Sequence, residues 1–313
     1  MALAPIGRRM GAGDWGRLFA LGFLWSWVFF LTKVALGDMP PFTVVALRLG
    51  IGAVMLHVAV AMGGSRMPTE PRAWFAFLGM GVLNNVLPFC LIAWGQIAIA
   101  SGLAAILNAT TPLFTVLLAH WLTADERLSA NRLGGVLLGL AGVAVMIGRD
   151  AFGGLTGNLL GQAAILGAAA SYACAGIFGR RLRGIEPIVA ATGQVTMSAL
   201  LAMALALWID RPWLLPMPGP AAWTAVASAA LFCTAVGYVL YFRVLAAAGA
   251  TNLLLVTLLM PAVAMLLGVA LLGEAIHARE IAGMALIGVG LVTIDGRVLA
   301  RFRLHPVQAV AHD

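Results

Sequence analysis

The sequence contains unusually little charge. Of its 313 residues only 10% are charged and 62% are hydrophobic, whereas about a quarter of the residues in soluble domains are charged. One soluble core could not bury so many apolar side chains, so the composition excludes an ordinary soluble enzyme and indicates a protein that lies in lipid. Lysine is nearly absent, because Lys33 is the only lysine among 19 basic residues.

The sequence also lacks the groups that ATP-driven motors and many enzymes use. No GxxxxGK[ST] phosphate-binding loop occurs, which excludes an ATP motor of that type. All twelve acidic residues fall in loops, tails or the last turn of a helix, so no buried carboxylate relay for protons is expected. The three cysteines show neither metal-ligand nor disulfide spacing. We therefore expect no cofactor, no metal site and no enzymatic activity.

Ten long apolar runs remain. A bilayer core of about 30 Å requires roughly 20 apolar residues per helix. Barrel strands would alternate apolar and polar residues with period two, and these runs do not. The sequence therefore predicts an all-α integral membrane protein with ten transmembrane helices, at residues 15–37, 41–63, 72–97, 102–122, 131–148, 158–180, 187–209, 220–246, 251–271 and 280–297.

The basic residues predict an orientation. With the N-terminus inside, thirteen arginines lie on the inner side, against Arg149, Arg211, Arg279 and Lys33 on the outer side. Because cytoplasmic loops carry an excess of Lys and Arg, both termini are predicted to be cytoplasmic and the number of helices even. A net charge of +7 with this distribution indicates orientation in a membrane rather than binding to nucleic acid.

The middle of the chain occurs twice. Residues 74–139 match those 149 positions further on, with Trp74 on Trp223 and Pro112 on Pro261. Each copy holds five helices, and an odd number inverts the second copy in the membrane, so we expect two inverted five-helix repeats. The predicted organisation is a cytoplasmic segment 1–14, a first half 15–148, a linker 149–157, an inverted second half 158–297 and a cytoplasmic tail 298–313.

Motifs that occur in the same order in both halves resemble those of a known family. The first half contains Gly102-Leu-Ala-Ala-Ile-Leu-Asn-Ala-Thr-Thr-Pro and then Asp125-Glu-Arg-Leu-Ser, and the second contains Ala250-Thr-Asn-Leu-Leu-Leu and Met260-Pro-Ala. With Val45-Ala-Leu-Arg-Leu, they resemble the drug/metabolite transporter superfamily and, within it, the ten-helix exporters with two EamA-type halves. The resemblance implies a bacterial inner-membrane exporter of small metabolites, often amino acids.

Polar and aromatic residues on shared helical faces are the candidates for the transport path, because polar side chains in hydrocarbon need a partner or a water-filled cavity. We expect them to surround a central cavity near the bilayer midplane. The alternative for each is structural, since such residues often bond only to a neighbouring helix or to a carbonyl one turn earlier. The candidates are Trp25, Asn84, Asn85, Trp94, Asn108, Thr111, Thr234, Tyr238, Tyr241 and Thr257.

Arg48 and three prolines are candidates for other roles. Arg48 lies about two turns into its helix, where it could contact a substrate anion or brace an outer gate, and its shallow depth favours the brace. Pro88, Pro112 and Pro261 each remove a backbone hydrogen bond, so we expect hinges there, with static kinks as the alternative. The oligomeric state is open between a homodimer and a monomer.

These features predict an exporter of small metabolites that works by alternating access without ATP hydrolysis, with amino acids as substrates and neutral aromatic ones favoured. The alternative is a phosphorylated-sugar or nucleotide antiporter of the same superfamily. That class should show several deep lysines or arginines for phosphate, and Arg48 is the only candidate. The expected partners are a small-molecule substrate and the lipid bilayer, and not nucleic acid.

Overall fold

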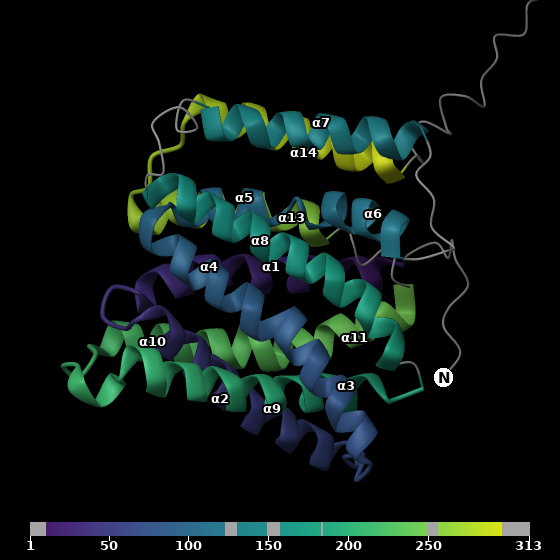
Figure 1. The fold of residues 1–313 in the computed structure, drawn as a ribbon, viewed down its shortest axis with the longest axis vertical. Helices are drawn as coiled ribbons and strands as arrows, with labels where there is room; N and C mark the ends of the chain where they lie inside the picture. The colour runs from purple at the N-terminus through teal and green to yellow at the C-terminus, as the bar shows by residue number, and fades with distance from the viewer. Residues whose placement is uncertain (1–10, 123–129, 149–156, 183, 249–255, 296–313) are drawn as a thin grey trace, which may run out of the picture.

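The computed structural model describes residues 11–122, 130–148, 157–182, 184–248 and 256–295, which contain helices and turns and no strand (Figure 1). In the first half the helices are α1 (Ala12–Ala35), α2 (Pro41–Met62), α3 (Pro71–Gly81), η1 (Val82–Val86), α4 (Leu87–Ala98), α5 (Ser101–Asn108), α6 (Thr111–Leu122) and α7 (Ala130–Ile147).

In the second half the helices are α8 (Gly157–Phe178), η3 (Gly179–Leu182), α9 (Pro187–Leu205), η4 (Ala206–Asp210), η5 (Pro212–Leu214), α10 (Pro220–Ser228), η6 (Ala229–Val236), α11 (Gly237–Ala248), α13 (Val256–Leu272) and α14 (Ala278–Asp295). Eight runs of helix are long and apolar enough to cross a membrane. A shorter apolar stretch lies in α13, and α14, of 18 residues, packs along α7. The arrangement agrees with ten crossings, and the predicted all-α membrane fold is confirmed.

Prolines set several of the helix starts. Pro41, Pro71, Pro187 and Pro220 are the first residues of α2, α3, α9 and α10. At this position proline's missing N–H costs no helical hydrogen bond, and its fixed φ already suits a helix. The same residues follow polar breaks in the sequence, which is why the predicted and observed starts of these crossings lie within one residue of each other.

The packing of the helices has an internal twofold symmetry. α1 contacts α13 as α8 contacts α6, and α4 packs on α8 as α10, η6 and α11 pack on α1. The pairs α2–α9, α5–α13 and α7–α14 each join two helices that the repeat exchanges. Exchanging the halves therefore reproduces these contacts, as expected for a repeat with a twofold axis.

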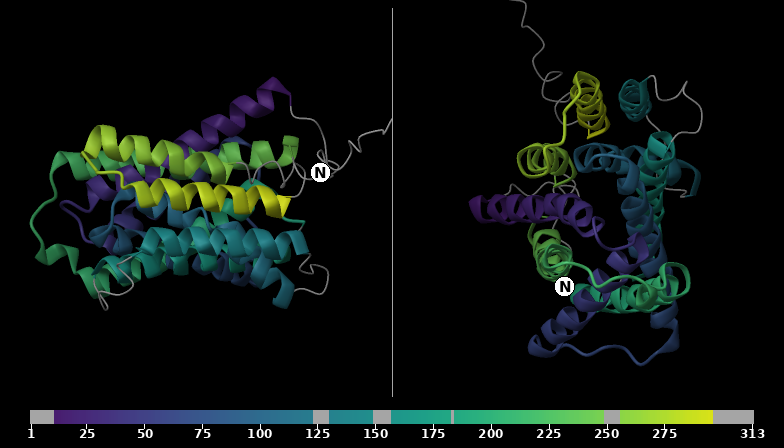
Figure 2. Two further views of the ribbon diagram at one scale, coloured as in Figure 1. Left: turned by 90° about the horizontal axis from the view of Figure 1, so that it is seen from above. Right: turned by 90° about the vertical axis from the view of Figure 1, so that its left-hand side faces the viewer.

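The pair α7 and α14 shows that the repeats are inverted. These helices lie together at one edge of the bundle (Figures 1 and 2). A Cβ on Gly135 would lie 2.5 Å from the carbonyl oxygen of Gly290, and one on Gly142 would lie 2.7 Å from that of Gly283. Because residue numbers rise along one helix as they fall along the other, the two equivalent helices run antiparallel.

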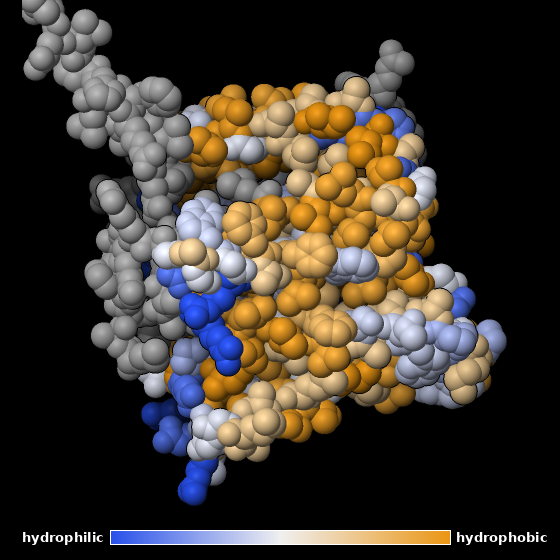
Figure 3. All heavy atoms as spheres, turned by 180° about the vertical axis from the view of Figure 1, so that it is seen from behind, coloured by the Kyte–Doolittle hydropathy of each residue, from blue (hydrophilic) through white to orange (hydrophobic). Residues whose placement is uncertain are grey.

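The surface agrees with a membrane location. In Figure 3 an apolar band crosses the face of the molecule, and hydrophilic side chains gather toward its two ends. Large apolar side chains point outward in several crossings, including Phe75, Leu200, Trp208 and Leu266. In a bilayer these side chains would contact lipid rather than water, so their exposure carries no hydrophobic cost.

Candidate functional site

Two π-helical segments lie at equivalent positions in the two halves. They are η1 in the third crossing and η6 in the eighth. Shifted by the repeat spacing of 149 residues, Val82–Val86 would cover 231–235, which lies inside η6. A π-helical turn holds an extra residue and re-aims the side chains around it, and such turns are frequent at functional sites. Asn84 and Asn85 lie on η1, and Thr234 lies on η6.

Hydrogen bonds join these segments across the two halves. The Tyr238 hydroxyl donates to Asn85 Oδ1 over 2.8 Å, and Asn84 Nδ2 donates to the Tyr238 hydroxyl over 3.3 Å. Asn85 Nδ2 donates to Ser198 Oγ on α9 over 3.0 Å, and Ser198 Oγ donates to the carbonyl of Gln194. Asn85 and Ser198 are fully buried. The third, seventh and eighth crossings are therefore linked by side chains inside the bundle.

Arg48 extends from α2 toward the same place. Its Nε donates to Thr234 Oγ1 over 3.0 Å, and its Cζ lies 4.1 Å from the centre of the Phe89 ring, a favourable cation–π distance. Gly52 makes room for this contact, because a Cβ there would come within 2.8 Å of Thr234 Cγ2. We call Arg48, Asn84, Asn85, Ser198, Thr234 and Tyr238 the polar cluster.

Trp25 and Tyr241 form an aromatic pair between α1 and α11. Their ring centroids are 5.7 Å apart with an interplanar angle of 28°. Trp25 Nε1 donates to the carbonyl of Cys233, next to Thr234 of the polar cluster, over 3.1 Å. Gly237 permits this approach, since a Cβ there would lie 2.7 Å from Trp25 Nε1. The pair thus packs against η6 and α11, the segments that carry Thr234 and Tyr238.

The polar residues of the fourth crossing bond mainly to their own helix. Thr111 Oγ1 donates to the carbonyl of Asn108 over 2.7 Å, and Thr115 Oγ1 donates to that of Thr111 over 2.9 Å. This is the structural alternative for these threonines. Asn108 Oδ1 is buried without a hydrogen-bond partner among the described residues. Thr257 lies on α13, but its side chain falls outside the described part of the structure.

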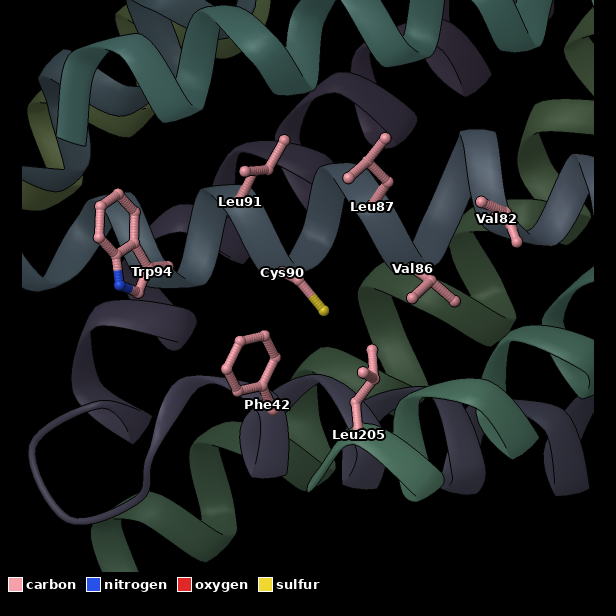
Figure 4. Close-up of a pocket in the computed structure, with 8 residues that line it drawn as sticks. All are labelled: Phe42, Val82, Val86, Leu87, Cys90, Leu91, Trp94 and Leu205. Atoms are coloured by element: carbon pink, nitrogen blue, oxygen red, sulfur yellow. The ribbon is translucent and has the colours of Figure 1, made fainter. Parts of the chain in front are cut away.

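Trp94 lies away from the polar cluster. It lines an apolar pocket of about 420 Å³ between α4, η1, α2 and α9, and it is 43% exposed. The side chains of Phe42, Val86, Cys90 and Leu205 approach one another across this pocket (Figure 4). This position fits the alternative of packing against apolar neighbours, and contact between Trp94 and a substrate stays a prediction.

The three prolines lie at three different kinds of position. Pro88 is the second residue of α4, directly after η1. Pro112 is the second residue of α6, after a break at residues 109–110 that interrupts the fourth crossing. Pro261 lies inside α13, which continues through it. The matched prolines of the fourth and ninth crossings therefore have different local backbones, and their role as hinges stays a prediction.

Sequence reasoning missed Ser198 and Tyr172, whereas Gln194 and Phe89 stand out in the sequence because they differ from their repeat equivalents, Arg48 and Tyr238. Ser198, Gln194 and Phe89 contribute to or flank the polar cluster, and Tyr172 on α8 interacts electrostatically with Arg48. The chain has only three tyrosines, and all of them lie in apolar runs. The argument that selected Tyr238 and Tyr241 as candidates therefore applied to Tyr172 as well. The described residues contain no group of three or more His, Cys, Asp or Glu side chains placed to hold a metal ion.

Comparison with known proteins extends over almost the whole chain. The inner membrane transporter YedA of Escherichia coli (strain K12), named as uncharacterized, is 29% identical over 301 residues, 94% of each chain. A probable amino-acid metabolite efflux pump of Salmonella typhimurium is 27% identical over 287 residues, 86% of this chain and 90% of that one. One crystal structure covers 92% of this chain with a TM-score of 0.66 at 21% identity, which supports the fold alone.

The family is decided by a direct match to both halves. The sequence profile of the EamA-like transporter family matches residues 15–148 and 159–294. These ranges contain the equivalent π-helical segments η1 and η6, the polar cluster and nearly all of the antiparallel pair α7–α14. The chain is a multi-pass membrane transporter that belongs to the EamA-like transporter family, within the drug/metabolite transporter superfamily.

Proposed function

We propose that this protein exports small metabolites, amino acids above all, by alternating access around the polar cluster. The observation that carries the proposal is the composition of that cluster, to which the third crossing of one half and the seventh and eighth of the other contribute hydrogen-bonded side chains. In inverted-repeat transporters the substrate lies between the repeats, and rocking of one repeat against the other exposes it to each side in turn.

The chemistry of the cluster supports a small polar substrate with an apolar part. Amide and hydroxyl groups provide hydrogen bonds, while Phe89 and the stacked pair Trp25–Tyr241 provide aromatic surface. The name of the Salmonella relative, a probable amino-acid metabolite efflux pump, supports the same class. A sugar-phosphate or nucleotide substrate would require several cations, and Arg48 is the only basic residue in the cluster.

We further propose that the protein lies in a bacterial inner membrane with both termini in the cytoplasm. The named location of YedA supports the membrane, and the excess of arginine on the side of the N-terminus supports the orientation. Labelling of a single cysteine placed in the loop at Ser65, by a reagent that cannot cross the membrane, tests it. Labelling in intact cells would contradict the orientation.

Flux through reconstituted protein tests the proposed activity. Proteoliposomes containing the full chain should show saturable efflux of one or more labelled amino acids, without ATP. Tyr238→Phe should reduce this flux strongly, because it leaves Asn85 Oδ1 without its donor. Thr293→Val is the matched control, since the Thr293 hydroxyl donates to the carbonyl of Val289 in its own helix, α14, outside the polar cluster. Equal fluxes of the two variants would contradict the assignment of the cluster.

The source of energy can be tested in the same vesicles. Among the described residues Asp38, Asp210 and Glu274 bind backbone groups at helix starts, and none belongs to the polar cluster. We therefore propose that the substrate gradient, and not a proton relay, drives export. Accumulation of substrate that follows an imposed pH gradient would contradict this part of the proposal.

A further inference from the structure

The third crossing follows a path that leaves a pocket beside it. It packs on α9 through α3 and η1, whereas its later part, α4, packs mainly on α8 and α2. π-helical turns are among the known causes of helix bends, and here the crossing moves away from α9 after η1. The apolar pocket of about 420 Å³ that Trp94 lines lies in this gap, with η1 and α4 on one side and Phe42 and Leu205 on the other (Figure 4).

Hydrogen bonds fix the walls of this pocket. Asn85 Nδ2 donates to Ser198 Oγ over 3.0 Å and holds η1 against α9. Asp210 Oδ2 accepts from the backbone N–H and the hydroxyl of Thr43 and holds the start of α2 against the end of the seventh crossing. Leu205 lies between Ser198 and Asp210 on that crossing. Closing the pocket would therefore strain hydrogen bonds on both sides of Leu205.

The lining of the pocket favours an apolar occupant. Apart from the Cys90 thiol and the indole N–H of Trp94, the lining side chains consist of hydrocarbon. A buried water needs about three hydrogen bonds to the protein, and this lining does not provide them. If the pocket stayed empty, its lining atoms would lose the dispersion contacts that a close-packed neighbour gives.

The mouth of the pocket is continuous with the lipid-facing surface. Leu87 and Trp94 lie seven residues apart on one face of α4, and each is 43% exposed. Both belong to the helical run Pro71–Ala98, which is long and apolar enough to cross a membrane. Val86 and Cys90 line the pocket behind them and are only 7% and 8% exposed. The lipid chains that cover α4 in a bilayer therefore reach the mouth directly.

The length and position of the pocket match one leaflet. Its wall runs from Val82 to Trp94, about 18 Å along the helix axis, and one leaflet contributes about 15 Å of a bilayer core of about 30 Å. Trp94 lies one turn before the end of α4, and Phe42 is the second residue of α2. Val82 lies near the middle of the third crossing. The pocket thus extends from the end of the bundle where α2 begins to its middle.

We propose that this pocket binds one acyl chain of a membrane phospholipid, which enters from the leaflet at the end where α2 begins. The end of the chain packs on Val82 and Val86, in the segment η1 that also carries Asn85. Lipid chains are as apolar as these side chains, so the site gains close packing rather than removal of apolar surface from water. The inference does not rest on the proposed function.

Photolabelling of the full chain in vesicles tests this site. A small share of the phosphatidylglycerol carries a diazirine in one acyl chain, and on illumination the diazirine loses N₂ and the resulting carbene inserts into a neighbouring C–H or S–H bond. Lipids that only surround the protein label residues such as Phe75 and Leu200, which are 72% and 63% exposed. A chain inside the pocket also labels Val86 and Cys90. Label confined to exposed residues of the wild-type protein would overturn the proposal.

The place of the diazirine along the chain tests the direction of entry. A diazirine near the end of the chain should label Val82, and one near the ester should label Trp94. The reverse order would place the lipid in the opposite leaflet and contradict the assignment.

A filled pocket separates this site from the general lipid surface. Leu205→Trp extends an indole into the pocket and should abolish the label on Cys90, while the label on Phe75 stays. Leu205→Phe adds less volume and should reduce the Cys90 label by less. Leu200→Trp makes the same change at an exposed position of α9 and serves as the matched control, with the Cys90 label unchanged. Full Cys90 label in a Leu205→Trp protein that keeps its unfolding temperature would overturn the proposal.

Discussion

Asp210 joins the two halves at the end of the bundle where α2 begins. Its Oδ2 accepts hydrogen bonds from the backbone N–H and the hydroxyl of Thr43, over 2.6 and 2.8 Å. Asp210 ends the seventh crossing in the second half, and Thr43 lies in the first turn of α2 in the first half. A carboxylate in this place also complements the positive end of the α2 dipole. Alternating access would require this contact to break when this end opens.

The hydrogen bonds of Asp210 allow an estimate of how much Asp210→Ala destabilises the closed form. Loss of a helix N-cap costs about 1 kcal/mol, and hydrogen bonds to charged groups contribute about 1.5–3 kcal/mol each. When the bundle opens at the start of α2, water replaces part of these hydrogen bonds. We therefore expect Asp210→Ala to destabilise the closed form by about 2 kcal/mol relative to the open form. At 1.4 kcal/mol per factor of ten, the ratio of open to closed molecules rises roughly 30-fold. Asp210→Asn keeps an acceptor and should have a smaller effect.

The labelling rate of a cysteine placed at a buried position measures the ratio of open to closed molecules. Met39 is 3% exposed and packs against α10 at the same end, so Met39→Cys in a chain without the three native cysteines reports opening through its rate of maleimide labelling. We expect Asp210→Ala to raise that rate about 30-fold. Asp14→Ala removes the ion pair with Arg17 at the opposite end and should leave it unchanged. An unchanged rate in a folded Asp210→Ala protein would refute the reasoning.

Two further predictions concern the packing of α7 against α14 and the role of Trp94. Gly135→Ala places a Cβ 2.5 Å from a carbonyl oxygen of α14, whereas a Cβ on the adjacent Gly134 meets nothing within 4 Å. The first substitution should therefore lower stability by about 1–3 kcal/mol, seen as a lower unfolding temperature in detergent, and the second should not. Trp94→Ala should leave amino-acid flux unchanged in proteoliposomes, because Trp94 lines the apolar pocket and not the polar cluster; a lost flux would return Trp94 to the substrate path.

The fold was largely predictable because lipid imposes it on the sequence. Each crossing needs a continuous apolar run, so ten runs and a matched spacing suffice to define ten helices in two inverted halves. The π-helical segments were not predictable in this way. Ala229–Val236 is as apolar as the α-helices around it, whereas Val82–Val86 contains two asparagines. An extra residue in one helical turn leaves no common mark on the composition of the two segments.

The members of the candidate site were predictable where polar faces of different helices converge. They were less predictable where the length of a side chain, or a hydrogen bond to its own helix, determines which residues it contacts. Asn84, Asn85, Thr234 and Tyr238 lie together as their shared faces suggest. Arg48 seemed too close to its helix end for such a site. Its long side chain nevertheless reaches Thr234 through the space beside Gly52, and its role as an anion contact or a gate brace stays a prediction.

The repeat places different side chains at equivalent positions of the two halves. Gln194 matches Arg48 at a spacing of 146 residues, and Tyr238 matches Phe89 at a spacing of 149. Arg48 therefore gives the polar cluster a charge that the twofold symmetry of the helices does not repeat. We expect the matched helices to serve the proposed alternating access and the unmatched side chains to serve the recognition of substrate.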